Sequence, residues 1–173
     1  HYEIYQKMGA HKVTCNGEEG VYFAVWAPHA RRAAVIGDFN DWDFEANYME
    51  RQEPLGIYTC FVPGVKEGEL YKFCIETEQG KRIFKADPFA NYAELRPGTA
   101  SRVTDISHLK WTDDAWMKSR QTWDHKERPM SIYEVHMGSW MRHPGREDEG
   151  FYTYREFADA IVKYVKDMGY THV

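Results

Sequence analysis

The stretch Gly37-Asp38-Phe39-Asn40-Asp41-Trp42 carries residue types that could act on a neutral, hydroxyl-rich ligand. Asp and Asn side chains hold turns by bonding their own backbone, so the two aromatics among them would be presented at fixed angles. We expect Phe39 to point into a core and Trp42 to point outward. An aromatic face beside amide and carboxylate groups suits a sugar ring, whose C–H face is apolar and whose rim carries hydroxyls. The alternative is that both aromatics are core residues, as most aromatics are.

The composition argues against several other classes of function. The net charge is −5 and Lys and Arg form no basic stripe, so we expect no nucleic-acid partner. No apolar run approaches the roughly 20 residues that span a bilayer, and the first residues lack a signal-peptide pattern, so we expect a cytoplasmic protein without a membrane partner. Cys15, Cys60 and Cys74 show no C-x-x-C spacing and the eight histidines are scattered, so we expect reduced thiols, no metal site and no cofactor.

The elements that must position this stretch are short strands. Apolar or alternating runs are separated by turn signals such as Asn16-Gly17 and Pro63-Gly64, and this pattern is typical of an antiparallel β-sandwich. Within residues 70–77, alternation places Lys72 on the face opposite the aromatic side chains, at the outer surface. A short helix over residues 2–8, closed by Gly9, precedes the strands. The predicted strands cover residues 12–14, 21–27, 33–36, 57–62, 70–77, 82–85 and 102–106.

Residues 109–129 form a predicted connector between this sandwich and residues 130–173. Thr112 can cap a short helix whose acidic first turn suits the helix dipole. Trp111, Trp116 and Trp123 lie in this otherwise polar segment. Bulky aromatics in a linker favour contact with another surface, so we expect a packed connector and not a free tether.

The hydrophobic period changes after Pro129. Residues 130–137 read as a strand, a polar Gly/Pro loop covers residues 143–150, and Thr153 with Glu156 forms a capping box. Apolar residues then recur every three or four positions on a helix of about four turns that Gly169 closes, and residues 171–173 begin another strand. This order is that of a β-α-β unit, the building block of parallel sheets and barrels. Because an incomplete unit cannot bury both faces of its strands, we expect an N-terminal fragment of a longer protein.

Taken together, the motifs and their order resemble the N-terminal part of bacterial 1,4-α-glucan branching enzymes over nearly the whole chain. This resemblance implies an immunoglobulin-like β-sandwich of carbohydrate-binding module family 48 within residues 1–108. It also implies that residues 130–173 are the first strand and helix of a truncated (β/α)8 barrel of glycoside hydrolase family 13. The resembling stretches are Gly9-Ala10-His11, residues 23–28, residues 37–42, residues 70–73, Asp87-Pro88-Phe89-Ala90, residues 95–101 and residues 133–140.

The resemblance implies a glycosyltransferase of glycogen biosynthesis that cleaves α-1,4 linkages and forms α-1,6 linkages with retention. That chemistry needs a carboxylate nucleophile and a carboxylic acid, which in this family follow the fourth and fifth barrel strands. The chain stops as it enters the second strand, so we expect no catalytic residue and no activity from it alone. Asp113 with Asp114 reads as a helix cap, and Glu147 with Asp148 and Glu149 as a solvated loop.

For α-glucan or glycogen binding, the resemblance points to Trp42 and Lys72, with Asn40 from the same loop motif as Trp42. The second aromatic platform that the family carries on the next hairpin is replaced here by residues 79–82. A single platform predicts a dissociation constant of about millimolar order. The alternative is a module that mainly packs against the catalytic barrel of its own chain. Glu134 and His136 are likewise either substrate contacts or satisfied polar groups inside that barrel.

Two other functions remain open at the level of sequence. One is an independent glucan-binding or regulatory module, although the β-α-β start after Pro129 argues against it. The other is the same segment of a debranching or trehalose-forming hydrolase, which shares the module and the barrel. The stretches at residues 95–101 and 133–140 favour the branching enzymes.

Overall fold

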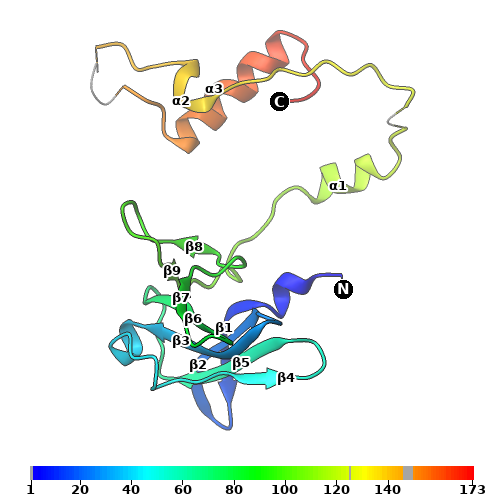
Figure 1. The fold of residues 1–173 in the computed structure, drawn as a ribbon. Helices are drawn as coiled ribbons and strands as arrows, with labels where there is room; N and C mark the ends of the chain where they lie inside the picture. The colour runs from blue at the N-terminus through cyan, green and yellow to red at the C-terminus, as the bar shows by residue number, and fades with distance from the viewer. Residues whose placement is uncertain (1, 125, 146–149) are drawn as a thin grey trace. The chain divides into compact units, whose positions relative to one another are not determined.

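The computed structural model describes residues 2–124, 126–145 and 150–173, which Figure 1 draws as a ribbon. The chain divides into two compact units, one ending at Lys110 and the other spanning Trp111–Val173. Glu147, Asp148 and Glu149 lie outside the described residues, so their expected role as a solvated loop stays a prediction. No helix in the described part combines the length and the apolar character needed to span a bilayer.

The first sheet of the N-terminal unit is antiparallel, with the strand order β1-β2-β5-β4. Its strands are β1 (Gly9–Cys15), β2 (Glu18–Trp26), β4 (Glu50–Gln52) and β5 (Ile57–Pro63). A tight turn at Asn16 and Gly17 joins β1 to β2, and both residues have positive φ, 51° and 86°. Such a turn matches the twist of the strands that it joins, so the Asn-Gly pair sets the register in which Cys15 faces Glu18.

The second sheet is also antiparallel and has β6 at its centre. Its strands are β3 (Ala30–Gly37), β6 (Leu70–Thr77), β7 (Arg82–Lys85), β8 (Tyr92–Ala93) and β9 (Ser101–Arg102). One edge of β6 pairs with β3 at residues 71–77. Its other edge pairs with β7 at residues 73–76 and with β9 at residues 70–71, and β8 pairs with β9.

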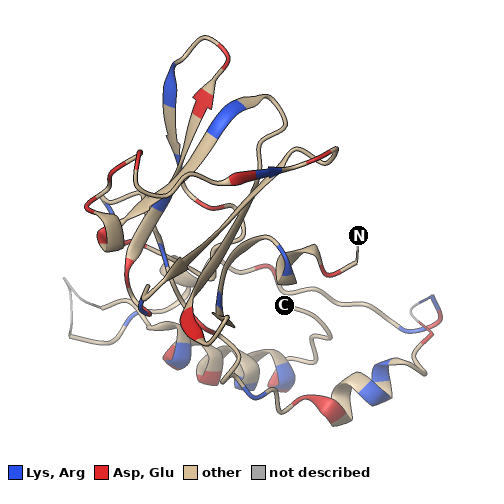
Figure 2. Ribbon diagram, turned by 90° about the horizontal axis from the view of Figure 1, so that it is seen from below, with Lys and Arg blue, Asp and Glu red and all other residues tan. Residues whose placement is uncertain are grey.

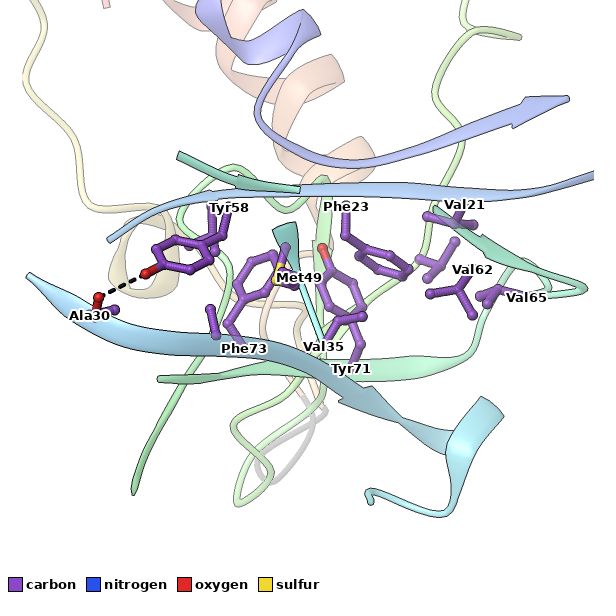
Figure 3. Close-up of a cluster of buried hydrophobic side chains, with 13 residues drawn as sticks. Val21, Phe23, Ala30, Val35, Met49, Tyr58, Val62, Val65, Tyr71 and Phe73 are labelled. Atoms are coloured by element: carbon purple, nitrogen blue, oxygen red, sulfur yellow. Dashed lines mark hydrogen bonds between the residues drawn. The ribbon is translucent and has the colours of Figure 1, made fainter. Parts of the chain in front are cut away.

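Large apolar side chains from both sheets fill the space between them, as Figure 3 shows. The predicted alternation along β6 is confirmed on this side, because Tyr71 and Phe73 are only 1% and 0% exposed. The rings of Phe23 and Tyr71 meet edge to face across the sheets, with centroids 5.1 Å apart. Full burial of one such side chain contributes about 1.5–3 kcal/mol, so this cluster is the main stabilising element of the sandwich.

A buried carboxyl group joins three parts of the sandwich. Asp87 accepts a hydrogen bond from the Tyr71 hydroxyl at 2.6 Å and another from the backbone N–H of Phe89 at 2.8 Å. Its own backbone N–H donates to the Ser101 hydroxyl at 2.8 Å. Burial raises the pKa of Asp87, while the bonds from Tyr71 and Phe89 act in the opposite direction. We call these four residues the Asp87 knot, since they hold β6, the segment after β7 and β9 at one point.

The outer face of the second sheet is more covered than alternation predicts. Cys74 and Glu76 point away from the main core but are 0% and 4% exposed. Phe44, from the loop after β3, packs with Cys74 in a second small apolar cluster. The Glu76 carboxylate pairs with Arg32 at 2.8 Å and Arg31 at 3.6 Å, and the hydrogen bond from Arg32 lowers its pKa. The loop therefore extends the core onto this face.

The sequence-based strands differ from the structure mainly at the ends of the unit. The predicted helix over residues 2–8 is wrong in extent: only one 3-10 turn, η1 (Ile4–Gln6), forms, because β1 already begins at Gly9. The two-residue strand β8 and the three-residue strand β4 are too short to show alternation and were not predicted. The strand predicted at residues 102–106 is limited to Ser101–Arg102.

The C-terminal unit contains α1 (Asp114–Arg120), α2 (Met137–Trp140) and α3 (Tyr154–Asp167). The prediction that Thr112 caps α1 is wrong, since the helix begins one residue too late for that side chain and its N-cap is Asp113. The predicted strand at residues 130–137 is also wrong. Only a single parallel bridge forms there, between Ile132 and His172. With one parallel neighbour, the segment lacks the second hydrogen-bonding edge that stabilises a buried strand.

Helix α3 confirms the sequence pattern at both ends. The Thr153 hydroxyl accepts from the backbone N–H of Glu156 while the Glu156 carboxylate accepts from the backbone N–H of Thr153, and Gly169 has a φ of 79° just after the helix. Ile161 and Val165 are the buried members of its apolar face, whereas Tyr154 is 81% exposed. Acidic and basic side chains are mixed along the helix, as Figure 2 shows.

Acidification is expected to unravel the first turn of α3. Hydrogen bonds from the backbone and hydroxyl of Thr153, with a further contribution from His143, lower the pKa of Glu156 from the ordinary 4.5 to about 2. Because the folded-state pKa is depressed, the contribution of the carboxylate to stability is complete above about pH 4.5 and is lost as the pH falls through about 2. Far-ultraviolet circular dichroism along this pH range measures the loss.

The matched variant is Glu156→Gln, which can keep the capping-box hydrogen bonds but does not titrate. Its helix content should change less between about pH 4.5 and about pH 2 than that of the unaltered chain. An equal acid loss in the two proteins would show that Glu156 is not the group responsible.

Candidate functional site

The loop after β3 holds Trp42 in an uncommon backbone conformation. A single 3-10 turn, η2 (Asp38–Asn40), is followed by Asp41 and Trp42 with φ values of 52° and 60°. The backbone N–H of Trp42 returns to the Gly37 carbonyl at 3.0 Å. A Cβ at Gly37 would meet the Leu70 carbonyl at 2.3 Å, so only glycine fits where the loop leaves the sheet. Bulky residues rarely adopt positive φ, which makes Trp42 a conformational outlier in this loop.

Asn40 is the residue that stabilises this conformation. Its side-chain oxygen accepts from the Gly37 backbone N–H at 2.9 Å. Its amide nitrogen donates to the Val35 carbonyl at 3.0 Å and to the Asn47 side chain at 2.8 Å. Both amide donors are thus directed at the protein. The predicted site residue Asn40 therefore shapes the loop from within.

Asp38 connects Trp42 to the strand that carries Lys72. One carboxylate oxygen accepts from the Trp42 indole N–H at 3.2 Å, and the other accepts from the backbone N–H of Leu70 at 2.8 Å. Trp42 keeps 38% of its surface exposed, whereas Phe39 packs against the main core, with its ring centroid 5.7 Å from that of Phe23. The predicted inward and outward directions of these two aromatics are confirmed.

Lys72 lies two residues after Leu70 on the outer face of β6, as predicted. Its ammonium group donates to the Thr99 hydroxyl at 2.7 Å, so the turn over residues 95–101 reaches the same surface. Trp42 and Lys72 are therefore brought to one end of the second sheet by Asp38 and by the direction of β6. Asp38 and Thr99 were not predicted as site residues. The four-residue spacing between Asp38 and Trp42 is a signal for the first contact, but nothing local in the sequence indicates the second.

Phe84 is a further exposed aromatic that sequence reasoning missed. It lies on β7 opposite Cys74, the outward neighbour of Lys72, and is 57% exposed. Cross-strand neighbours offset by two residues lie within reach of an aromatic side chain, so Phe84 flanks the surface around Lys72. In the adjoining β6–β7 hairpin, Arg82 bonds Glu45 at 2.9 Å and lies over the Phe44 ring at 4.0 Å. The hairpin thus contributes the stack of Arg82 on Phe44 and, two residues further along β7, the exposed ring of Phe84.

Trp42, Phe84 and Lys72, with the Thr99 hydroxyl, form what we call the outer-sheet site. Two exposed apolar rings with an ammonium and a hydroxyl group nearby can contact the C–H faces and the hydroxyl rim of a sugar. Within residues 2–124, 126–145 and 150–173, no three His, Cys, Asp or Glu side chains come together as a set of metal ligands. The groups of the outer-sheet site can contact a ligand through hydrogen bonds and apolar contacts.

Comparisons with known proteins agree with this chemistry. Residues 7–90 match the family described as carbohydrate-binding module 48 (isoamylase N-terminal domain). Over its full length the chain is 54% identical to the 1,4-α-glucan branching enzyme GlgB of Butyrivibrio fibrisolvens, covering 27% of that protein. It is 47% identical to GlgB of Protochlamydia amoebophila, covering 24%. The chain thus spans about a quarter of the length of these curated relatives.

Two solved structures show a similar fold. The catalytic module of the glycogen-degrading pneumococcal virulence factor SpuA aligns with 95% of this chain and 26% of its own, with a TM-score of 0.63 and 22% identity. Pullulanase from Anoxybacillus sp. LM18-11, complexed with maltotetraose, aligns with 78% of this chain and 18% of its own, with a TM-score of 0.56 and 20% identity. At these identities the likeness concerns the fold alone.

Replacing Asn40 with alanine is expected to lower the free energy of unfolding by about 1–3 kcal/mol, because it leaves the partly buried partners of its amide unpaired. Urea denaturation followed by tryptophan fluorescence measures the change. Gln79→Ala, which removes an exposed amide from the β6–β7 hairpin, is the control and should stay within about 0.5 kcal/mol. If the two variants are equally stable, Asn40 does not hold the loop.

Proposed function

We propose that residues 7–90, which match carbohydrate-binding module family 48, form a module of that family, and that the chain is the non-catalytic, α-glucan-associated segment of a 1,4-α-glucan branching enzyme. Its relatives at 54% and 47% identity over the whole chain support this assignment. The complete enzyme would cleave α-1,4 linkages and form α-1,6 linkages in glycogen. The segment's own task would be to hold an α-1,4-glucan near that chemistry.

The observation that carries the proposal is the conformation of Trp42. Backbone strain of this kind costs of order 1–3 kcal/mol and persists where the surrounding structure holds it, often at functional sites. Here the Asn40 and Asp38 hydrogen bonds hold it, and the result is an indole that remains 38% exposed. A loop that served only to fill a core would turn this ring inward, as it does with Phe39.

Lys72 and Phe84 extend the proposed binding surface beyond Trp42. Lys72 would donate to sugar hydroxyls, and Phe84 would supply a second apolar face in place of the aromatic platform that is missing from residues 79–82. Asn40 would act indirectly by fixing the loop. Since the contacts are few and exposed, we expect weak binding, with a dissociation constant of about millimolar order.

Residues 130–173 are proposed to be the start of the catalytic barrel of the parent enzyme, with α3 as its first helix. Support comes from the parallel bridge between Ile132 and His172 on either side of α3, since a parallel pair joined through a helix is the unit from which such barrels are built. Residues 1–108 and 109–129 are proposed as the binding sandwich and its packed connector. The catalytic carboxylates of the family would lie beyond this chain.

Two alternatives remain less well supported. An independent glucan-binding module would have no need of the β-α-β pattern after Pro129. The same segment of a debranching hydrolase is compatible with the fold shared with SpuA and pullulanase, but those structures are only 22% and 20% identical. The higher identities belong to branching enzymes, which therefore remain the preferred assignment.

Titration with maltoheptaose should give a dissociation constant of about millimolar order, and Trp42→Ala should weaken binding about two- to tenfold through loss of the aromatic face. Isothermal calorimetry or protein-observed NMR measures the affinity. The control is Trp111→Ala, which removes a tryptophan that is 80% exposed and lies outside the proposed site. Equal affinity for the unaltered chain and Trp42→Ala would assign Trp42 to packing alone.

The isolated chain is expected to show no branching of amylose, because the proposal places both catalytic carboxylates outside it. Iodine staining of amylose and chain-length analysis after isoamylase digestion measure the reaction, with a full-length branching enzyme as the positive control. New α-1,6 linkages made by the pure chain would overturn the proposed non-catalytic role.

A further inference from the structure

A groove of the sandwich contains the groups of a sugar site and shares no residue with the outer-sheet site. It is a groove of about 500 Å³, a volume in the range of small-molecule sites. Its walls come from η1, the start of β1, the segment after β7 and the segment after β9. We call it the Tyr5 groove. The residues that the argument uses are Tyr5, Gln6, His11, Asn91, Asp105 and Ser107.

The groove presents one exposed aromatic ring. Tyr5 is 59% exposed although it lies on η1, which is anchored to the body of the sandwich. The anchoring residue is Met8, which is only 3% exposed and whose carbonyl is 2.9 Å from the His11 imidazole. The ring is therefore held at the groove by a fixed turn and is not covered by the protein.

The segments after β7 and β9 contribute polar groups that local hydrogen bonds hold in place. The Asn91 amide nitrogen donates to the Thr104 carbonyl at 3.1 Å, so the side-chain oxygen of Asn91 points away from that carbonyl. One oxygen of Asp105 accepts from the Ser107 backbone N–H at 2.8 Å, and the side chain of Ser107 also bonds this carboxylate. Hydrogen bonds from Ser107 lower the pKa of Asp105, so the group is a carboxylate at neutral pH.

These groups favour a neutral polyhydroxyl ligand over an anionic one. A charged Asp105 repels phosphate and carboxylate groups, whereas it accepts hydrogen bonds from vicinal hydroxyls. Lys12, the cation at the groove, is 3.8 Å from the Glu67 carboxylate. An aromatic ring, an amide and a carboxylate that line one groove match the apolar face and the hydroxyl rim of a glucose unit.

We propose that the Tyr5 groove is a second α-1,4-glucan subsite, with Tyr5 as the stacking platform and Asn91 and Asp105 as the hydroxyl-binding groups. The proposal rests on the proposed function for the class of ligand, but it concerns residues that share no side chain with the outer-sheet site. The two sites can therefore be tested in one experiment.

The experiment is a titration of the 15N-labelled chain with maltoheptaose, followed by amide and indole NMR signals. The backbone amides of Gln6, Asn91 and Ser107 report on the groove, and the indole N–H of Trp42 reports on the outer-sheet site. The proposal expects both sets to shift. Tyr5→Ala should weaken binding at the groove about two- to tenfold, with the Trp42 signal responding as before.

Tyr2→Ala is the matched control, since Tyr2 is 95% exposed two residues before η1 and does not line the groove. It should leave both sets of shifts unchanged. Asp105→Asn keeps an oxygen for the Ser107 N–H but removes the charge, and it should also weaken the groove response. Cellohexaose, a β-1,4-glucan, serves as the ligand control and should bind the groove more weakly.

The outcomes separate the two proposals. If the Trp42 signal shifts and the groove amides do not, the groove is not a glucan site and the proposed function stands. If neither set shifts, both proposals are wrong. Groove shifts that persist unchanged in Tyr5→Ala and Asp105→Asn, with both variants folded by their spectra, would also overturn the assignment.

Discussion

The Asp87 knot is the interaction on which the rest of the N-terminal unit depends. Tyr71 lies between Leu70, which bonds Asp38, and Lys72, so anchoring its hydroxyl fixes the strand at the outer-sheet site. A carboxyl group buried without partners would destabilise the fold, but here it accepts two hydrogen bonds, and the adjoining backbone N–H donates a third. These hydrogen bonds thus specify a single arrangement of the strands. Apolar packing alone would define that arrangement less well.

The same knot determines the geometry of the second proposed site. Asp87 is followed closely by Asn91, and Ser101 on β9 is followed by Thr104 and Asp105, so the two segments that meet at the knot continue into one wall of the Tyr5 groove. Asn91 and Thr104 are 13 residues apart in the chain, and the hydrogen bond between them joins the two segments. The Asp87 knot therefore positions residues of both the outer-sheet site and the Tyr5 groove.

The features that could be predicted from sequence are those set by short-range forces. Strand β6 lies between clear turn signals, and the Thr153–Glu156 capping box is local, so both were predicted with correct bounds or partners. The contact of Asp38 with Leu70 spans 32 residues and depends on how two strands meet, so no local pattern reports it. The strand predicted at residues 130–137 is wrong although its local pattern is clear. Their apolar pattern is that of a strand with neighbours on both edges, and only one parallel bridge is available in the described chain.

Weak individual contacts are consistent with a polymeric ligand. A site of about millimolar affinity holds a short oligosaccharide poorly, but a second site on the same rigid sandwich meets the remainder of a long chain at high effective concentration. This gain in affinity requires a fixed distance and orientation between the two sites. Binding at the first site then costs no additional free energy for ordering the second. The Asp87 knot satisfies that requirement for the outer-sheet site and the Tyr5 groove. An exposed, strained tryptophan on a loop and an exposed tyrosine on a single 3-10 turn would then act together on glycogen, where either alone would be a marginal contact.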